Sequence, residues 1–239
     1  MSAEIAIRDE RCWRYMVCGR SRGAVNDCVE IGAVLPAPIS PETANDCFDY
    51  AESVCRIAGL TYGTFHVEMI LTDKGPALVE VNPRAMGGMM PVLYKLLTGT
   101  DFCDYIIKLQ VGEVLPAIPT GVHGTVTARR LLSRGSTQLP NVIDLRQLTG
   151  ADSKILAFEN FMPTCGSEVR EQQLLGRFAV RGNTWKEAMQ LANDLVVRFE
   201  QVIGIPLIMP QDVGDVDVTW EMPEMRSVAD SITVRTLGF

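Results

Sequence analysis

Residues 64–84 read TFHVEMILTDKGPALVEVNPR and predict two antiparallel strands joined by a tight turn. Apolar and polar side chains alternate on both sides of Asp73-Lys74-Gly75, as they do in strands with one buried face. A three-residue loop with Gly75 in the left-handed conformation would place Thr72 opposite Pro76. Because the side-chain period of a strand is two residues, this turn decides which side chains share a face.

The register that follows from this turn places two glutamates directly opposite each other. Counting outward pairs Ile70 with Leu78 and Glu68 with Glu80. One face of the hairpin is then apolar and consists of Phe65, Val67, Met69, Leu71, Ala77, Val79 and Val81. The glutamates lie on the other face with Cβ atoms about 5 Å apart, where like charges destabilise a sheet. Something must offset this repulsion.

A divalent cation offsets the repulsion between Glu68 and Glu80 better than a raised pKa on one of them. Asn82 lies two residues along the same face and adds a neutral oxygen. Three hard oxygen ligands favour Mg²⁺ or Mn²⁺ over zinc. Because Mg²⁺ readily shares its coordination shell with phosphates, the pattern indicates a nucleotide site. The alternative is a solvated hairpin whose outer face carries two glutamates.

An arginine and a pair of glycines follow the hairpin. Arg84 lies two residues beyond Asn82, where it could stabilise negative charge on a transferred phosphoryl group or an oxyanion. Gly87 and Gly88 permit close approach of the backbone to a ligand. The structural alternatives are an ordinary surface arginine and a plain turn.

These residues resemble the carboxylate–amine ligases of the ATP-grasp superfamily, which join amino acids into dipeptides. The resemblance is carried by HVEMILTDKGPALVEVNPRAMGG at residues 66–88 and by MMPVLYKLLTGTDFCDYIIKLQVGE at residues 89–113. It extends from about Ser2 to Ile205 and is most specific from Gly63 to Glu113. The E-x-N-P-R motif, placed twelve residues after an upstream glutamate, is a more specific signal than a lone short pattern.

The resemblance implies a reaction and a role for each residue of the motif. Glu68, Glu80 and Asn82 correspond to the family's Mg²⁺ ligands. A substrate carboxylate, such as that of an amino acid, would attack the γ-phosphate of ATP, and an amine would then attack the acyl phosphate. Arg84 corresponds to the arginine that holds the transferred phosphoryl group and stabilises the tetrahedral intermediate. The implied cofactors are ATP and Mg²⁺ or Mn²⁺.

Further residues near the motif receive roles from the same resemblance. Gly87 and Gly88 would form part of the acceptor pocket, where small residues leave room for a bulky substrate. Ile70 and Leu78 share the face of the glutamates and would form the floor of the adenine pocket. The alternative is that both are core residues. His66 lies on this face too, and we interpret it as a structural histidine with satisfied hydrogen bonds.

The sequence departs from the family in its extent. The family's N-terminal domain and the subdomain with the phosphate-covering glycine-rich loop have no counterpart here, and Ser2 and Glu4 would belong to an acidic strand deep in the ATP-grasp domain. The basic segment at residues 18–23, CGRSRG, predicts a strand end with a solvated turn. We therefore expect a C-terminal half that is inactive without a separate N-terminal half. A fragment, a subunit of a split enzyme and a decayed module remain open.

The rest of the chain predicts an α+β protein with two units and a tail. Residues 1–119 would form the C-terminal half of an ATP-grasp domain, an antiparallel sheet with helices. A proline-containing run at residues 115–119 would end this unit. Residues 120–208 predict a small accessory α+β domain. Residues 209–239 have no clear periodicity and predict a partly disordered tail.

Two helices are predicted with defined starts. Ser40 precedes Pro41 and would cap a helix that Gly59 ends. An amphipathic pattern predicts a second helix from Thr184 to about Val202.

Composition limits the partners and the compartment. The net charge of -7 argues against nucleic acid or an anionic membrane as a partner, because both require a basic face. The seven cysteines include no CxxC pair and no zinc-ligand spacing, so we expect buried thiols in a cytoplasmic protein. No apolar run is long enough to predict a membrane span.

Two other functions remain open. The segment RFAVRG at residues 177–182, with the helix after it, also suits a protein like biotin carboxylase or carbamoyl-phosphate synthetase. The residues that follow Arg84, AMGG, lack the charged run of the carboxylases. A non-catalytic module would bind metal without turnover in any assembly.

Overall fold

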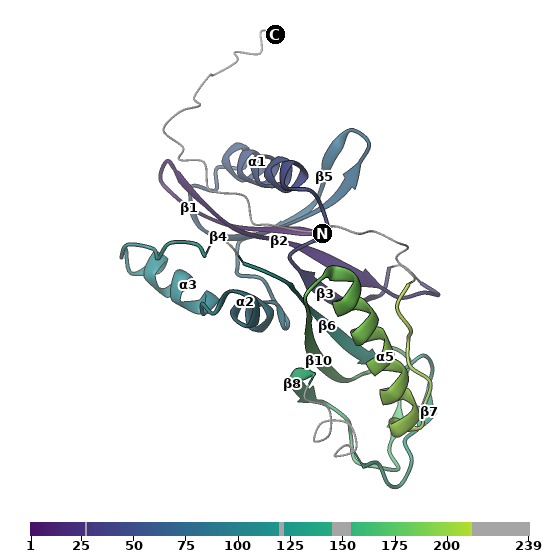
Figure 1. Ribbon diagram of the computed structural model, residues 1–239. Coiled ribbons are helices and arrows are strands. Elements are labelled where there is room, and N and C mark those ends of the chain that lie inside the picture. The colour runs from purple at the N-terminus through teal and green to yellow at the C-terminus, as the bar shows by residue number, and fades with distance from the viewer. Residues whose placement is uncertain (27, 120–121, 145–153, 212–239) are drawn as a thin grey trace.

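The computed structural model describes residues 1–26, 28–119, 122–144 and 154–211, so most of the predicted tail lies outside the described residues. A long antiparallel sheet dominates the described part of the chain (Figure 1). Its strands are β1 (Ser2–Arg8), β2 (Arg11–Arg22), β3 (Glu30–Leu35), β4 (Tyr62–Thr72), β5 (Gly75–Asn82), β6 (Thr125–Leu132), β8 (Ile155–Asn160) and β10 (Leu174–Gly182). Their order across the sheet is β5-β4-β1-β2-β3-β6-β10-β8.

Helices cover both faces of this sheet, which confirms the predicted α+β class (Figure 1). They are α1 (Pro41–Ile57), α2 (Met90–Thr98), α3 (Phe102–Gln110) and α5 (Trp185–Ile203). Val17 packs in the core under α1, and Val34 packs against α5. The next residues, Cys18 and Leu35, point the other way into the core under α2 and α3. Helices α1 and α5 therefore share one face, and α2 and α3 cover the other.

Both predicted helix starts are confirmed. The Ser40 hydroxyl accepts from the backbone N–H of Thr43, with Pro41 as the first helical residue of α1. The Thr184 hydroxyl accepts from the backbone N–H of Glu187 at the start of α5. Each cap satisfies a donor that the first helical turn leaves without a partner.

The hairpin of β4 and β5 confirms the central pair and corrects the turn. Glu68 lies opposite Glu80, as predicted. The turn contains two residues rather than three, because Thr72 pairs with Gly75 and not with Pro76. A bulge in β5 at Val79 absorbs the extra residue and restores the predicted register toward the end of the hairpin.

The same bulge contradicts two details of the predicted hairpin. Leu78 pairs with Met69 and Ile70 pairs with Ala77, so the predicted pairing of Ile70 with Leu78 is wrong. Val79 is 54% exposed and does not belong to a buried apolar face. The prediction assumed that side chains alternate strictly along the whole of β5. The bulge interrupts this alternation.

A strand that the sequence analysis did not predict lies at the centre of the sheet. Strand β3 pairs with β2 on one side and with β6 on the other. A Cβ at Gly32 would lie 2.1 Å from the carbonyl oxygen of Ala128, so only glycine permits this approach of β3 to β6. Strand β2 continues to Arg22, and the predicted solvated turn at residues 18–23 is therefore wrong. Pairing with β3 keeps this segment extended.

The pairing of β3 with β6 joins the two predicted units in one sheet. Strands β6, β8 and β10 come from the predicted accessory domain, and α5 packs on β6 and β10. A small second sheet contains β7 (Thr137–Gln138) and β9 (Glu168–Val169). The boundary at residue 119 itself stays a prediction.

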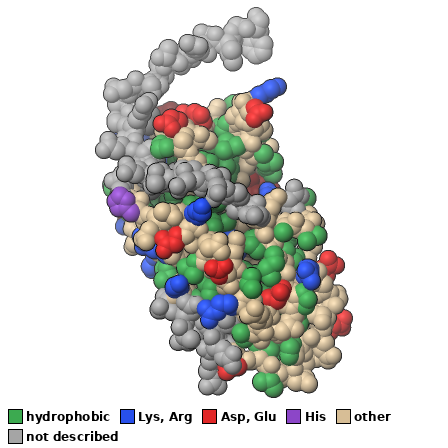
Figure 2. All heavy atoms as spheres, turned by 45° about the vertical axis from the view of Figure 1, so that its right-hand side comes forward, with side chains coloured by type: hydrophobic (Ala, Val, Ile, Leu, Met, Phe, Trp, Pro, Cys, Tyr) green, Lys and Arg blue, Asp and Glu red, His purple; other side chains and the backbone are tan. Residues whose placement is uncertain are grey.

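The surface is mixed in character. Acidic, basic and apolar side chains are interspersed on the face shown in Figure 2. Within the described ranges, no helix is long and apolar enough to cross a membrane. No disulfide joins the cysteines, all of which lie in the described part. The prediction of buried thiols holds for Cys18, Cys47 and Cys55. Cys12 is half-buried, and the exposed cysteines are Cys28, Cys103 and Cys165.

Candidate functional site

A pocket of about 320 Å³ opens on the α2 side of the sheet, above strands of both predicted units. Alternation places Arg20 of β2, Glu68 of β4, Arg130 of β6 and Arg177 of β10 on this one face. The loop before α2 forms the opposite wall. The charged, histidine and loop-glycine residues that line the pocket include Arg20, Glu30, His66, Glu68, Arg84, Gly87, Gly88, Arg130 and Arg177.

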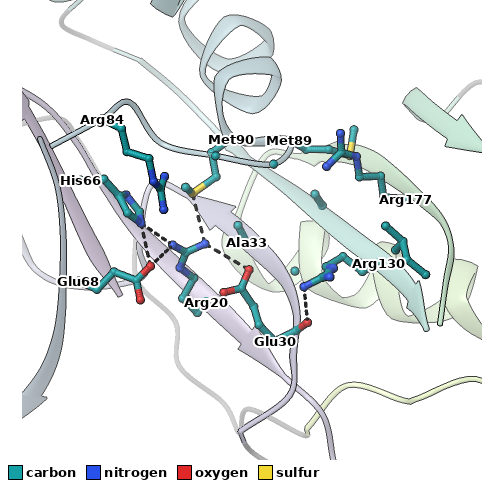
Figure 3. A pocket seen from close by; sticks show the side chains of 15 residues that line it. Arg20, Glu30, Ala33, His66, Glu68, Arg84, Met89, Met90, Arg130 and Arg177 are labelled. Atoms are coloured by element: carbon teal, nitrogen blue, oxygen red, sulfur yellow. Dashed lines mark hydrogen bonds and ion pairs between the residues drawn. The ribbon is translucent and has the colours of Figure 1, made fainter. Parts of the chain in front are cut away.

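Arg20 organises one side of the pocket (Figure 3). Its guanidinium donates to Glu68 Oε1 at 3.1 Å and to Glu30 Oε1 at 3.2 Å. The same group lies 2.9 Å from His66 Nε2. Only 11% of the Arg20 side chain is exposed, so these ion pairs are partly shielded from water. Arg20 therefore offsets the negative charge of Glu68, a role for which the sequence analysis predicted a metal ion.

His66 connects Glu68 to a second, buried carboxylate. His66 Nδ1 lies 2.6 Å from Glu4 Oε1, and Nε2 lies 2.8 Å from Glu68 Oε1. Both His66 and Glu4 are buried. Burial lowers the pKa of His66, but hydrogen bonds to Glu4 and Glu68 outweigh it and raise the pKa above its ordinary value. The interpretation of His66 as a hydrogen-bonded structural residue is confirmed, and its partner Glu68 makes it part of the site.

Glu68 is held as an ionised carboxylate. Partial burial raises its pKa, but the hydrogen bond from His66 and the charge of Arg20 outweigh this effect and lower the pKa below its usual value. A carboxylate with a lowered pKa at the pocket rim suits a cation or a cationic substrate group.

The other side of the pocket carries two more arginines. Arg177 donates to Glu159 Oε2 at 2.7 Å, and its guanidinium lies over the Phe161 ring at 5.4 Å. Arg130 donates to the backbone oxygen of Glu30 at 3.2 Å. Figure 3 shows Arg130 and Arg177 across the pocket from His66 and Glu68.

Arg84 and the two glycines lie where the chain enters α2. Arg84 lines the pocket and donates to the backbone oxygen of Ala85 at 3.0 Å. Figure 3 shows its guanidinium extending toward His66 and Arg20. Gly88 has φ of +62°, a left-handed conformation that favours glycine. The structure thus brings Glu68, Arg84 and both glycines to one pocket.

The remaining predicted site residues do not line this pocket. Asn82 donates from Nδ2 to Glu80 Oε1 at 2.7 Å on the neighbouring strand β5. Ile70 and Leu78 are 55% and 44% exposed on the outer part of the hairpin. Their assigned roles with metal and adenine stay predictions.

The hairpin residues fit a hard cation by donor type. Glu68 and Glu80 are cross-strand neighbours, and Asn82 already directs its amide toward Glu80. In the part of the chain that the structure describes, no group of three or more His, Cys, Asp or Glu side chains is arranged to hold a metal ion. The candidate set therefore consists of two carboxylates and an amide oxygen, which suits Mg²⁺ or Mn²⁺ rather than a soft metal.

Sequence reasoning missed Arg20, Arg130 and Arg177. Arg20 was assigned to a solvated turn because β3 was not predicted. The sign that could have identified Arg130 is Thr-Ala-Arg-Arg-Leu at residues 127–131, where a charge interrupts an otherwise buried strand.

Sequence relatives support the predicted resemblance over part of the chain. No protein-family model matches the sequence. The chain is 34% identical to carnosine synthase 1 from Homo sapiens over 91 residues, which are 38% of this chain and 11% of that protein. It is 36% identical to dapdiamide A synthase from Enterobacter agglomerans over 68 residues, which are 28% of this chain and 15% of that protein. The matches cover a small part of these relatives.

Solved structures share the fold. The L-amino acid ligase from Bacillus licheniformis matches 81% of this chain and 51% of its own, with a TM-score of 0.69 and 16% identity. Phosphoribosylglycinamide synthetase from Anaerococcus prevotii matches 87% of this chain and 52% of its own, with a TM-score of 0.67 and 16% identity. The chain spans about half the length of these structures. Its fold is that of the ATP-grasp ligases, and the predicted resemblance to carboxylate–amine ligases is confirmed.

Proposed function

We propose that this chain, which has the fold of the ATP-grasp ligases, supplies the metal-binding and catalytic half of an ATP-dependent carboxylate–amine ligase. The observation that carries the proposal is the cross-strand pair of Glu68 and Glu80, with Asn82 beside it and Arg84 at the pocket. Glu68, Glu80 and Asn82 would hold Mg²⁺ or Mn²⁺, which supplies charge neutralisation on the phosphates of ATP.

The proposed reaction has two steps. An oxygen of the substrate carboxylate attacks the γ-phosphorus of ATP, the bond to ADP breaks, and an acyl phosphate forms. The amine nitrogen then attacks the acyl carbon, the carbon–oxygen bond to phosphate breaks, and the nitrogen loses a proton. Arg84 neutralises the phosphoryl oxygens in the first step and the oxyanion in the second. Arg20 and His66 keep Glu68 oriented and ionised throughout.

The relatives favour this function over the carboxylase alternative. Biotin carboxylase from Campylobacter jejuni shares the fold with a TM-score of 0.57 at 14% identity, and such a likeness concerns the fold alone. Carnosine synthase 1 and dapdiamide A synthase match in sequence at 34% and 36% identity, and both names are those of synthases. The contrary hypothesis is a non-catalytic module. Measured turnover of ATP and substrates would exclude it.

The proposed activity also needs a part that covers the nucleotide, on the same polypeptide or on a separate one. The chain spans about half of the L-amino acid ligase, and Ile70 and Leu78 stay exposed where the adenine would lie. We expect the assembly to act in the cytoplasm on an amino acid carboxylate and an amine.

Amine-dependent release of phosphate from ATP tests the proposal. The chain is mixed with an N-terminal ATP-grasp half as a separate polypeptide, and phosphate and amide product are quantified together. We expect release only with both parts and Mg²⁺, and a loss of at least a hundredfold in Arg84→Gln. Metal binding without turnover in every pairing would favour the non-catalytic module.

A further inference from the structure

A second pocket, of about 230 Å³, lies on the opposite face of the sheet from the main pocket. It is bounded by the loop that leads into α1 and by the first turns of α5. Alternation along β2 sends the Arg20 side chain to the main pocket and the Ser21 side chain to this one. The lining residues used below are Ser21, Val34, Pro38, Ile39, Trp185 and Met189.

The second pocket combines apolar walls with positive charge. Arg20 and Arg22 are the charged residues that line it, and no Asp or Glu of the described residues does so. Valine, proline, isoleucine, methionine and tryptophan side chains supply the rest of its surface. Pockets for drug-sized ligands have volumes of about 300 Å³ or more, so this one suits a smaller molecule. A small ligand with an apolar body and a negative charge matches these walls.

Two buried hydrogen-bond donors of this pocket have no acceptor. The Trp185 side chain lines the pocket, the residue is only 6% exposed, and its Nε1 has no hydrogen-bond partner within the described ranges. Ser21 is also 6% exposed, and its Oγ accepts from Arg129 Nη1 at 2.9 Å. Because arginine can only donate, the Ser21 hydroxyl proton stays available for another acceptor. A ligand that brings an acceptor would satisfy donors that are costly to leave unpaired.

A buried positive charge lies directly behind the Ser21 hydroxyl. Arg129 is fully buried, and no carboxylate of the described residues forms an ion pair with it. Its oxygen acceptors are all neutral, namely Ser21 Oγ, Thr127 Oγ1, Asn193 Oδ1 and the Ala128 carbonyl. Burial lowers the pKa of Arg129 to about 10, so the group is still charged at neutral pH. An anion bound to Ser21 would offset this charge, and Arg129 in turn makes the Ser21 hydroxyl a stronger donor.

We propose that this second pocket binds a small carboxylate with an apolar body, such as a short-chain carboxylic acid. The Ser21 hydroxyl and the Trp185 indole N–H donate to the carboxylate, and Arg129 supplies positive charge behind Ser21. Val34 and Met189 contact the apolar body. The site lies on the other face of the sheet from the proposed reaction pocket and does not depend on the ligase function.

A titration of the ¹⁵N-labelled full chain with hexanoate, without ATP or metal, tests this proposal. The readout is the indole N–H signal of Trp185, which is assigned by its absence in Trp185→Phe. This signal should shift, and hexanoate should bind about tenfold more tightly than hexanamide, because a charged acceptor forms stronger hydrogen bonds. Acetate has the charge without the apolar body and should bind about tenfold or more weaker than hexanoate. The signal of Trp13, which packs on the α2 side of the sheet, should not shift.

Substitution of each donor separates the site from non-specific binding. Ser21→Ala should weaken hexanoate binding about fivefold or more, because the carboxylate loses a donor. Ser53→Ala is the matched control, since Ser53 is exposed on α1 and does not line the pocket. Trp185→Phe, followed by calorimetry, should also weaken binding about fivefold. Thermal unfolding verifies that each variant is folded, and either donor variant alone is sufficient for the test.

Several results would contradict the proposal. Equal affinities for hexanoate and hexanamide would show that the carboxylate is not recognised. Equal affinities of Ser21→Ala and Ser53→Ala for hexanoate, with Trp185→Phe also unchanged, would show that the two donors do not bind it. An unchanged Trp185 signal at tens of millimolar hexanoate would exclude the pocket as the binding site, whether or not other signals shift.

Discussion

The contact of His66 with Glu4 is the most consequential single interaction on the floor of the site. Glu4 is fully buried, one of its oxygens lies 2.6 Å from His66, and the other has no hydrogen-bond partner within the described ranges. A buried carboxylate that loses its partner is strongly destabilising. The residue that orients Glu68 therefore also contributes to stability.

His66→Ala should lower the free energy of unfolding by about 3 kcal/mol, because it leaves the Glu4 carboxylate buried without its partner. Urea denaturation followed by circular dichroism measures the change. The chain's other histidine, His123, is exposed, and His123→Ala should change stability by less than about 0.5 kcal/mol. Equal effects of the two substitutions would show that the contact contributes nothing.

Gly88 belongs to the site through its backbone. Its φ of +62° lies in the left-handed region, which costs a residue with a Cβ about 1 kcal/mol or more. Gly88→Ala should lower the unfolding midpoint accordingly. Gly135→Ala is the control, since a Cβ at Gly135 would meet nothing within 4 Å. A midpoint that shifts equally in both variants would contradict the conformational argument.

At the scale of elements, α1 is anchored to the sheet by a charged group away from the pocket. Glu52 accepts from Arg56 at 2.8 Å and from Arg14 of β2 at 3.3 Å. Partial burial raises the pKa of Glu52, but the hydrogen bonds from the two arginines outweigh it and lower the pKa. The contact should therefore depend on pH.

A carboxyl group with a lowered folded-state pKa adds stability above its unfolded pKa, and loses it as the pH falls through the folded value. Glu52→Gln should cost about 1 kcal/mol at neutral pH and flatten the loss of stability below about pH 5. Asp49→Asn removes a 66% exposed partner of Arg14 and should have a smaller effect. Denaturation curves at several pH values compare the variants. Parallel curves for Glu52→Gln and the unsubstituted chain would contradict the assignment.

The β4–β5 hairpin shows how far sequence reasoning extends at this scale. Alternation and a turn signal were sufficient to predict that Glu68 lies opposite Glu80. They could not predict the bulge at Val79, because a two-residue turn with a bulge and a three-residue turn without one give the same pairing beyond it. The predicted pairs nearer the turn are therefore wrong, whereas the predicted pairing of Glu68 with Glu80 is right.

At the scale of the whole molecule, the pocket depends on strand order. Arg20, Arg130 and Arg177 come together only because β3 joins β2 to β6. No local pattern states which distant strands become neighbours, so the sequence could mark Arg130 as a charge in a buried strand but could not bring it together with Arg20 and Arg177. The motif residues from Glu68 to Gly88 could be assigned, since one hairpin and the loop after it position them all.

The continuous sheet predicts cooperative unfolding. Strands from both predicted units are hydrogen-bonded through the β3–β6 pair, so neither unit should unfold alone. Tryptophan fluorescence and far-ultraviolet circular dichroism should give coincident urea transitions, since Trp13 lies in β2 and Trp185 in α5. Two separated transitions would show that the units are independent domains.

Mn²⁺ binding to the full chain, followed by electron paramagnetic resonance, tests whether the hairpin is a metal site. In the presence of ATP, we expect the unsubstituted chain to bind Mn²⁺ and Glu80→Gln to bind it at least tenfold more weakly. Glu113→Gln, which changes an exposed glutamate outside the pocket, should bind like the unsubstituted chain. Equal Mn²⁺ affinity in Glu80→Gln and Glu113→Gln, or no binding by the unsubstituted chain, would contradict the metal site and with it the proposed ligase chemistry.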